Sequence, residues 1–233
     1  MAKGDSFWEV FDSDLPFLGA KYGKNRARMA IVGLGNGGLL VVSPGALPSE
    51  EQWAELAKCG EPRFLLAPNH FHNGGIAVWQ ARFPHAQVVA HPLALKRLRK
   101  KVPGVAFHDM KVLVGELPEH MHLLAPPGAK QGELWLSLQV AAGRAWFVTD
   151  AIINETKLPR GLLGWLVWLL GFRAALMTNP FFKRLFLADK RAYQTWVIEQ
   201  LEREAPVLFV PAHGKALQGA EVGERLRVAT ERA

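Results

Sequence analysis

Four side chains that could bind a metal follow apolar runs typical of buried strands. His70 and His72 come directly after the run 63–67, and Asp150 and His213 each end a later run. In extended backbone residues i and i+2 point the same way, so we expect the two imidazoles to converge. If the three strand ends share one edge, all four side chains meet in one cleft. Imidazole and carboxylate groups bind zinc, iron, manganese or copper, and this set suffices for one ion with an open coordination position.

Each of these residues also has an ordinary structural interpretation. A histidine can cap a loop or hydrogen-bond a strand end, and Asp150 could begin a turn. The combination is more specific than any single member, because four candidate ligands stand at three strand-to-loop boundaries. We therefore predict a site at this edge.

The elements that must position these residues form two halves, each rich in hairpins and followed by helices. Strands are expected at 28–34, 39–43, 63–67, 87–90, 111–114, 121–124, 134–140, 145–149 and 207–210, and helices from Ser49 to about Gly60 and at 76–83, 93–101 and 191–204. Two such halves predict two sheets packed face to face with helices outside. We expect an α/β fold, a four-layer αββα sandwich, in a single domain spanning 1–233.

Composition is that of a globular protein with a substantial core. The chain has 233 residues, 49% of them hydrophobic, and includes eight Trp and thirteen Phe. Cys59 is the only cysteine, which excludes an internal disulfide and a Cys-rich zinc knuckle. The first ten residues lack the apolar run of a signal peptide or membrane anchor, so we expect a cytoplasmic protein.

A net charge of +7 includes a basic run on the helix expected after Pro92. This run could attract phosphates or an anionic membrane, but such a pattern is more typical of a solvated helix face. No recognition motif accompanies it, so we expect no nucleic-acid partner. Its members are Lys96, Arg97, Arg99, Lys100 and Lys101.

A second unusual segment is the apolar stretch at 161–172, with sequence GLLGWLVWLLGF. A helix that is hydrophobic on every face must be buried in a core, form a dimer or touch lipid. It is too short to span a bilayer of roughly 30 Å, and 161–182 is interrupted by Arg173, Asn179 and Pro180. Three interpretations stay open: a core helix, a homodimer interface, or peripheral membrane contact aided by flanking bases such as Lys157 and Lys183.

The segment from His70 resembles the metallo-β-lactamase superfamily signature His-x-His-x-Asp-His. Val148-Thr149-Asp150 and Ala212-His213-Gly214 are similar to its bridging aspartate and its last histidine. The chain looks closer still to an uncharacterised bacterial branch, which has a Gly-Gly-Leu-x-Val-x-Ser-Pro stretch (here 37–44) and an Ala-Pro-Asn-x-x-His loop (here 67–72). The resemblance extends from about residue 28 to 220. It implies an apolar helical insertion at about 157–187 over the metal cleft, where Trp165, Trp168 and Phe172 could line a pocket or a mobile lid.

The sequence departs from that signature at three positions. Gly74 and Gly75 stand where the signature has Asp and His, and Ala129 stands where it has the histidine of a hairpin. Glu133 or His122 could replace a lost ligand. These losses argue against a two-metal centre, so we expect one divalent ion at most, zinc first, with iron or manganese as alternatives, or none.

The resemblance, with these departures, leaves three functions open. The first is a metal-dependent hydrolase of a small ester, lactone, amide or thioester with an apolar group, in which Asp150 serves as both ligand and catalytic base. The second is a non-catalytic or ligand-binding protein that has lost its metal centre. The third is a mononuclear iron oxygenase-like site.

Overall fold

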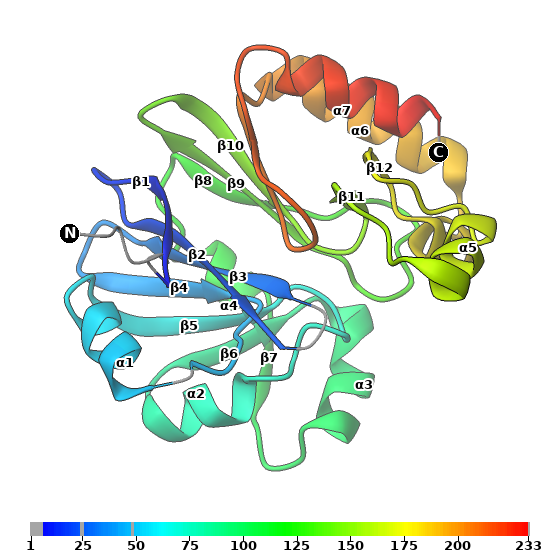
Figure 1. The fold of residues 1–233 in the computed structure, drawn as a ribbon. Coiled ribbons are helices and arrows are strands. Elements are labelled where there is room, and N and C mark those ends of the chain that lie inside the picture. Colours follow the sequence, from blue (N-terminus) through cyan, green and yellow to red (C-terminus); the bar gives the residue numbers. More distant parts are fainter. Residues whose placement is uncertain (1–6, 24–25, 48, 233) are drawn as a thin grey trace, which may run out of the picture. The chain divides into compact units, whose positions relative to one another are not determined.

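The structure is a computed structural model that describes residues 7–23, 26–47 and 49–232. It divides into two compact units, Met1–His120 and Met121–Ala233. Figure 1 shows both along the chain, from blue to red. Each unit contains its own sheet and its own helices, and each is described here by itself.

The first unit is built on a seven-stranded sheet whose strands lie in chain order. Strands β1 to β4 pair antiparallel, and β4 to β7 pair parallel through the crossover helices α1, α2 and α3. The strands are β1 (Glu9–Asp12), β2 (Phe17–Tyr22), β3 (Ala27–Gly33), β4 (Gly38–Val42), β5 (Glu61–Ala67), β6 (Gln87–Ala90) and β7 (Phe107–Asp109). The helices are α1 (Glu50–Ala57), α2 (Ile76–Arg82), α3 (Pro92–Lys101) and the short α4 (Lys111–Val114).

Local sequence explains the turns and helices that place the end of β5. Gly35 and Gly37 both have positive φ in the turn that joins β3 to β4, which confirms the expected hairpin. The crossover helices bury Trp53, Ile76 and Trp79 against the sheet. The basic run on α3 is exposed, as a solvated helix face should be.

The strand expected at 111–114 is wrong: this segment is helix α4. Asp109 ends β7, and its Oδ1 accepts a hydrogen bond from Lys111 N at 2.9 Å. A carboxylate that caps backbone N–H groups favours a helical turn over a further strand. The apolar residues at 112–114 therefore reflect one helical turn and not a strand.

The second unit contains a five-stranded sheet in the order β14-β13-β10-β9-β8 and a separate two-stranded ribbon, β11-β12. Its strands are β8 (Met121–Leu124), β9 (Trp135–Val140), β10 (Gly143–Val148), β11 (Ile152–Asn154), β12 (Leu176–Thr178), β13 (Leu208–Pro211) and β14 (Leu217–Gln218). Its helices are α5 (Gly161–Leu169), a π-helical turn η1 (Phe182–Phe186), α6 (Lys190–Glu204) and α7 (Val222–Glu231). Helices α6 and α7 pack on the sheet through a core that includes Trp135, Trp146, Tyr193, Phe209 and Leu226.

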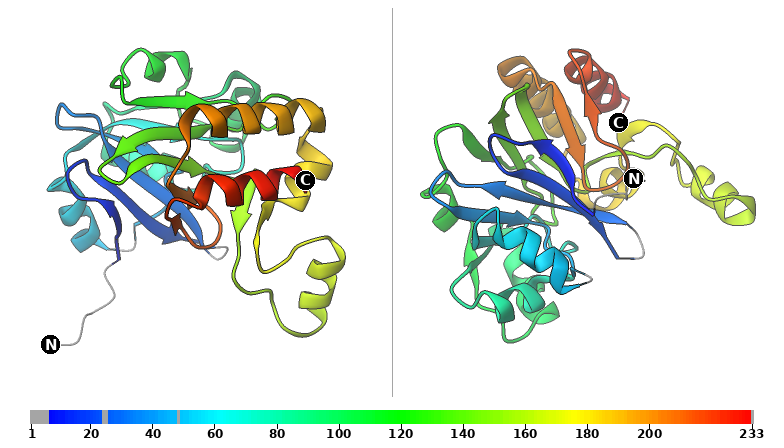
Figure 2. Two further views of the ribbon diagram at one scale, coloured as in Figure 1. Left: turned by 90° about the horizontal axis from the view of Figure 1, so that it is seen from above. Right: turned by 60° about the vertical axis from the view of Figure 1, so that its left-hand side comes forward.

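Within this unit, residues 155–175 form a helical excursion between the two strands of the β11-β12 ribbon (Figure 2), whereas Phe182 and Leu187 of the expected insertion at about 157–187 belong to the core. Gly164 is the one buried residue of α5, so the core-helix interpretation is wrong. The local structure explains why this glycine is needed, since a Cβ there would lie 1.9 Å from Pro159 O. Among the described residues, every helix is too short or too polar to cross a bilayer.

Candidate functional site

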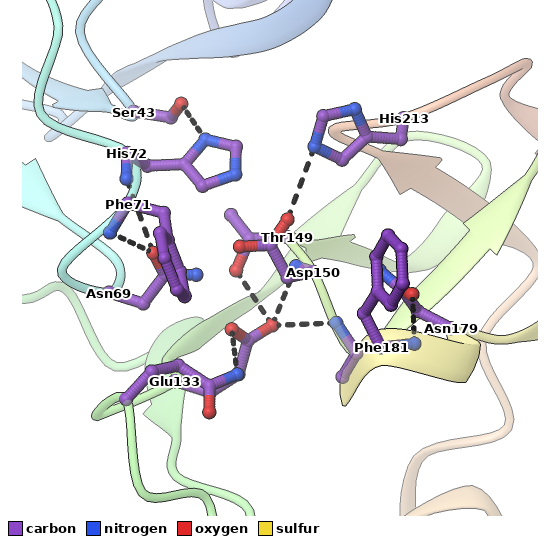
Figure 3. Close-up of polar contacts among 12 residues, drawn as sticks. Ser43, Asn69, Phe71, His72, Glu133, Thr149, Asp150, Asn179, Phe181 and His213 are labelled. Carbon is purple, nitrogen blue, oxygen red and sulfur yellow. Dashed lines mark hydrogen bonds and ion pairs between the residues drawn. The ribbon is translucent and has the colours of Figure 1, made fainter. Parts of the chain in front are cut away.

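Asp150 and His213 are brought together by the register of two parallel strands in the second unit. Val148 at the end of β10 pairs with Pro211 at the end of β13. Each functional residue lies two positions beyond its strand end, so matched register places them side by side. Asp150 Oδ1 lies 3.2 Å from His213 Nε2 (Figure 3). The expected pairing of these two strand ends is therefore found.

The loop that carries His213 is fixed by backbone contacts with β11. Asn154 N donates to His213 O at 3.1 Å, and Lys215 N donates to Asn154 O at 2.9 Å. Gly214 has φ +98°, and a Cβ there would lie 1.9 Å from Asn154 O. Glycine is required at this close approach, which holds the histidine in place.

Glu133 organises the other strand end, around Asp150. Its side chain is buried, and Oε1 accepts hydrogen bonds from Thr149 Oγ1 at 2.7 Å, Asp150 N at 2.9 Å and Ala151 N at 3.0 Å (Figure 3). A buried carboxylate with this many donors is well compensated. In this arrangement Glu133 positions the backbone of Asp150 and does not present itself as a substitute ligand.

The separation of the Asp150 and His213 atoms is compatible with two kinds of interaction. It suits a hydrogen-bonded ion pair. It also suits two ligands of one tetrahedral zinc, since bonds of roughly 2.0–2.2 Å place neighbouring ligand atoms roughly 3.3–3.5 Å apart. Both side chains are partly exposed, with 18% and 22% of their surfaces accessible, so the pair is reachable from solvent.

In the first unit His70 and His72 lie in the turn after β5. Asn69 is buried, and its Oδ1 accepts from Phe71 N at 2.8 Å and from His72 N at 3.2 Å (Figure 3). Asn73 Nδ2 donates to His70 O at 2.7 Å. The Asn69 and Asn73 side chains thus hold this segment in a bent turn. The expectation that the rings of His70 and His72 converge assumed extended backbone, which this turn does not have.

Each ring has its own partners. His72 Nδ1 lies 2.7 Å from Ser43 Oγ, which also contacts Tyr22 OH at 2.7 Å. His70 Nε2 lies 3.0 Å from Arg97 Nη1 on α3, and Lys101 Nζ donates to His70 O at 3.2 Å. A guanidinium only donates, so Nε2 of His70 is the acceptor in this contact. A metal at this nitrogen would have to displace Arg97.

Ser43 and Tyr22 were missed as functional residues by sequence reasoning. Ser43 is buried directly after β4, in a left-handed conformation with φ +57°. A hydrogen bond at Nδ1 fixes the orientation of a histidine that coordinates through Nε2. The available signal was the serine of the 37–44 stretch, which the sequence marks as a motif without indicating its partner.

The three positions that depart from the signature differ in the space around them. A Cβ at Gly74 meets nothing within 4 Å, but at Gly75 it would lie 2.6 Å from Pro44 O and 2.7 Å from Gly45 C. Ala129 is buried in the core of the second unit and pairs with Leu187. The backbone around Gly75 and the packing around Ala129 therefore exclude the signature's histidines without rearrangement.

His122, the second residue considered as a substitute ligand, has a structural role. His122 Nε2 lies within hydrogen-bonding distance of one carboxylate oxygen of Glu204, whose other oxygen accepts from Ser137 Oγ at 2.6 Å and from Trp146 Nε1. This cluster links β8, β9 and β10 to the end of α6. In this arrangement His122 contributes to the packing of the sheet and helix.

Comparison with known proteins identifies the fold. No protein-family model matches the sequence, and no curated protein sequence is significantly similar to it. Solved structures, in contrast, match along nearly the whole chain. A metallo-β-lactamase from Erythrobacter litoralis is 16% identical over 97% of this chain and 96% of that chain, with a TM-score of 0.60. The chain has the metallo-β-lactamase fold.

Two further structures with this fold were solved with metals bound. TTHA1623, in a di-iron-bound form, is 16% identical over 89% of this chain and 97% of that chain, with a TM-score of 0.58. The metallo-β-lactamase FIM-1 from Pseudomonas aeruginosa, in a mono-zinc form, is 15% identical over 97% and 94%, with a TM-score of 0.57. The αββα fold class expected from the sequence is confirmed, while identities this low carry no activity across.

Proposed function

We propose that this chain is a hydrolase of the metallo-β-lactamase fold that uses at most one metal ion. Its substrate would be a small ester, lactone, amide or thioester bearing an apolar group. The observation that supports the proposal most directly is the convergence of Asp150 Oδ1 and His213 Nε2 at adjacent strand ends. One carboxylate and one imidazole form a donor set that suits zinc, and also iron or manganese.

The residues of the second unit have distinct proposed roles. Asp150 and His213 would hold the ion, and Glu133 keeps the Asp150 backbone in place. A bound ion supplies the chemistry by lowering the pKa of a coordinated water toward neutrality. The signature that the sequence resembles would join His70 and His72 of the first unit to this set.

Proton transfer is the second role that the proposal must assign. Gly74 stands where the signature has its water-orienting aspartate, and it carries no side chain for this task. Asp150 is then the remaining carboxylate of the signature, so we assign it the role of general base as well as ligand. A carboxylate with two oxygens can coordinate through one and accept a proton or hydrogen bond through the other.

The test is metal analysis of protein purified without added metal, beside the variants Asp150→Ala, His213→Ala and His72→Ala. The proposal expects bound zinc in the wild type and its loss in each variant, with turnover of generic acyl esters that stops on chelation. His108→Ala is the matched control, because His108 is exposed on β7. Less than about 0.1 metal per chain, unchanged after soaking with zinc, iron or manganese, would overturn the proposal.

A second candidate, a non-catalytic protein with this fold, is favoured by the packing at the lost ligand positions. Gly75 lies against the backbone of 44–45, and Ala129 lies in a core. A chain that binds no metal but retains a small apolar ligand would support it. Iron with an O₂-dependent spectrum would instead favour the oxygenase-like site. The cytoplasmic location stays a prediction, which fractionation of cells would test.

A further inference from the structure

Helix α5 presents an apolar surface to solvent on nearly all sides. Leu162 is 72% exposed, Trp165 56% and Trp168 47%. Leu163, Leu166, Leu169 and Leu170 are exposed as well. Figure 2 shows α5 projecting from the β11-β12 ribbon of its unit. An apolar patch of this kind marks a contact with another molecule.

The charges around this patch have one sign. Between Thr156 and Ala188 the sequence contains five basic residues, Lys157, Arg160, Arg173, Lys183 and Arg184, and no acidic one. Two of them cap the C-terminal end of α5. Arg173 Nη1 donates to Trp168 O at 2.8 Å with its guanidinium 4.6 Å from the Trp168 ring, and Arg184 donates to Leu170 O.

A small cavity of about 240 Å³ lies at the base of this excursion, between its C-terminal part and α7. Of the residues that the structure describes, four cations line this cavity, Arg173, Lys183, Arg184 and Arg232, and none of the lining side chains is a carboxylate. Burial and the neighbouring charges of Lys190 and Arg184 lower the pKa of Lys183. The cavity is smaller than the roughly 300–1,000 Å³ of sites for drug-sized ligands, so it suits a small anionic group.

We propose that α5 and this cavity form a docking surface for an anionic phospholipid bilayer. Helix α5 lies in the plane of the membrane interface with its leucines among the acyl chains, and the cavity accepts a lipid phosphate. Exposed Trp side chains and basic flanking residues are the features that favour a position at the boundary between lipid headgroups and acyl chains. The surface lies wholly in the second unit and is independent of the proposed hydrolase activity.

Charge favours a membrane over a second copy of this chain. In a two-fold dimer the same patch occurs on both subunits, so the five cations of one copy would face those of the other. With no acidic residue between Thr156 and Ala188, such an interface has like charges at its rim. An anionic lipid surface neutralises these charges instead.

Cosedimentation with vesicles tests the apolar part of the surface. The wild type is expected to bind vesicles of phosphatidylcholine mixed with phosphatidylglycerol and to show Trp quenching by brominated lipid. Leu162→Ser/Trp165→Ser should weaken binding at least about tenfold. The matched control is Val78→Ser/Leu93→Ser, at exposed apolar positions of the first unit. An equal loss in the control, or no binding by the wild type, would overturn the proposal.

The basic part is tested by removing charges that line the cavity. Lys183→Gln/Arg232→Gln should weaken binding to the mixed vesicles about 25-fold, because each cation near an anionic surface contributes about fivefold. Lys96→Gln/Lys100→Gln makes the same charge change on the exposed face of α3 and should have little effect. A comparable loss from this second pair would show attraction by net charge alone and contradict the proposed surface.

The alternatives to a membrane, a second copy of this chain or a small anion, would each give a different result in these experiments. A sedimentation mass of two chains that Leu162→Ser/Trp165→Ser converts to one, without vesicle binding, would show a dimer interface. Tight binding of inorganic phosphate without vesicle binding would show a small-anion site. Either result overturns the membrane proposal, and neither changes the metal analysis that tests the hydrolase.

Discussion

Glu133 stabilises the strand end at Asp150 through Oε1, which accepts hydrogen bonds from Thr149 Oγ1, Asp150 N and Ala151 N and a fourth, at 3.3 Å, from Trp135 Nε1. Its negative charge also raises the pKa of Tyr193, after burial, which has the larger effect. Removing this carboxylate leaves two backbone amides, a hydroxyl and the Trp135 indole without the acceptor they have in the folded chain. The cost of such a loss exceeds that of an ordinary surface hydrogen bond.

We therefore predict that Glu133→Ala lowers the free energy of unfolding by more than about 3 kcal/mol. Glu133→Gln keeps an acceptor oxygen and should lose only about 1–2 kcal/mol. Urea denaturation measures both. Glu202→Ala, at an exposed carboxylate of α6, is the control and should change stability by less than about 0.5 kcal/mol. Equal effects of the Gln and Ala variants would contradict the role of the acceptor.

Adjacent glycines give a second prediction for single residues. Gly75→Ala should destabilise the chain by about 1–3 kcal/mol, because its Cβ would meet the backbone of 44–45. Gly74→Ala has open space and should change stability by less than about 0.5 kcal/mol. Thermal denaturation of the two variants measures both effects, and Gly74→Ala is the control for Gly75→Ala. Similar costs at both positions would show that the crowding at Gly75 does not determine its residue type.

The attachment of α6 to the sheet depends on Glu204 at the end of the helix. Burial raises the pKa of its carboxyl, but hydrogen bonds from Ser137, Trp146 and His122 together lower it by more. The net pKa in the folded chain lies below the ordinary value of 4.5. A group whose pKa is depressed by folding stabilises the fold above its unfolded pKa, and this contribution is lost as pH falls through the folded value.

Stability should therefore depend on pH through this contact. We predict that the difference in unfolding free energy between wild type and Glu204→Gln decreases as pH falls through 4.5 and below. Glu199→Gln, at an exposed position of the same helix, should show no such change. Urea midpoints across this range measure the effect. A difference that grows toward acid pH would have the wrong sign.

Metal binding affects the whole molecule, because an ion that binds only the folded chain stabilises the fold. A ligand present at about 100 times its dissociation constant stabilises the folded state by about 2.7 kcal/mol. For a chain of this length that corresponds to a rise in Tm of about 5–10 °C. We predict this shift on adding zinc and its absence in Asp150→Ala, as measured by calorimetry. A shift that persists in the variant would place zinc elsewhere.

The organisation of the chain as one domain of 233 residues stays a prediction. Each of the two units buries its own hydrophobic core. The boundary after His120 contains no linker rich in Pro, Gly or Ser, and Met121 begins β8 directly. The metallo-β-lactamase fold itself spans both units.

The sequence by itself predicted most elements and the fold class, and the candidate site residues that it named stay a prediction. Apolar periodicity and glycine turns depend on neighbouring residues, so the β3-β4 hairpin, α3 and α6 could be predicted. Helix α4 was predicted as a strand because one turn has too few residues for a clear period. The β11-β12 ribbon was missed because its strands of three residues carry no pattern of their own.

Only the tertiary structure decided what each candidate residue touches. It placed Asp150 beside His213 through strand register, directed Glu133 to backbone amides and brought Arg97 to His70. It also showed that α5 is exposed, which composition left open. Hydrogen-bond partners and solvent exposure arise between segments far apart in the chain, so local sequence cannot specify them.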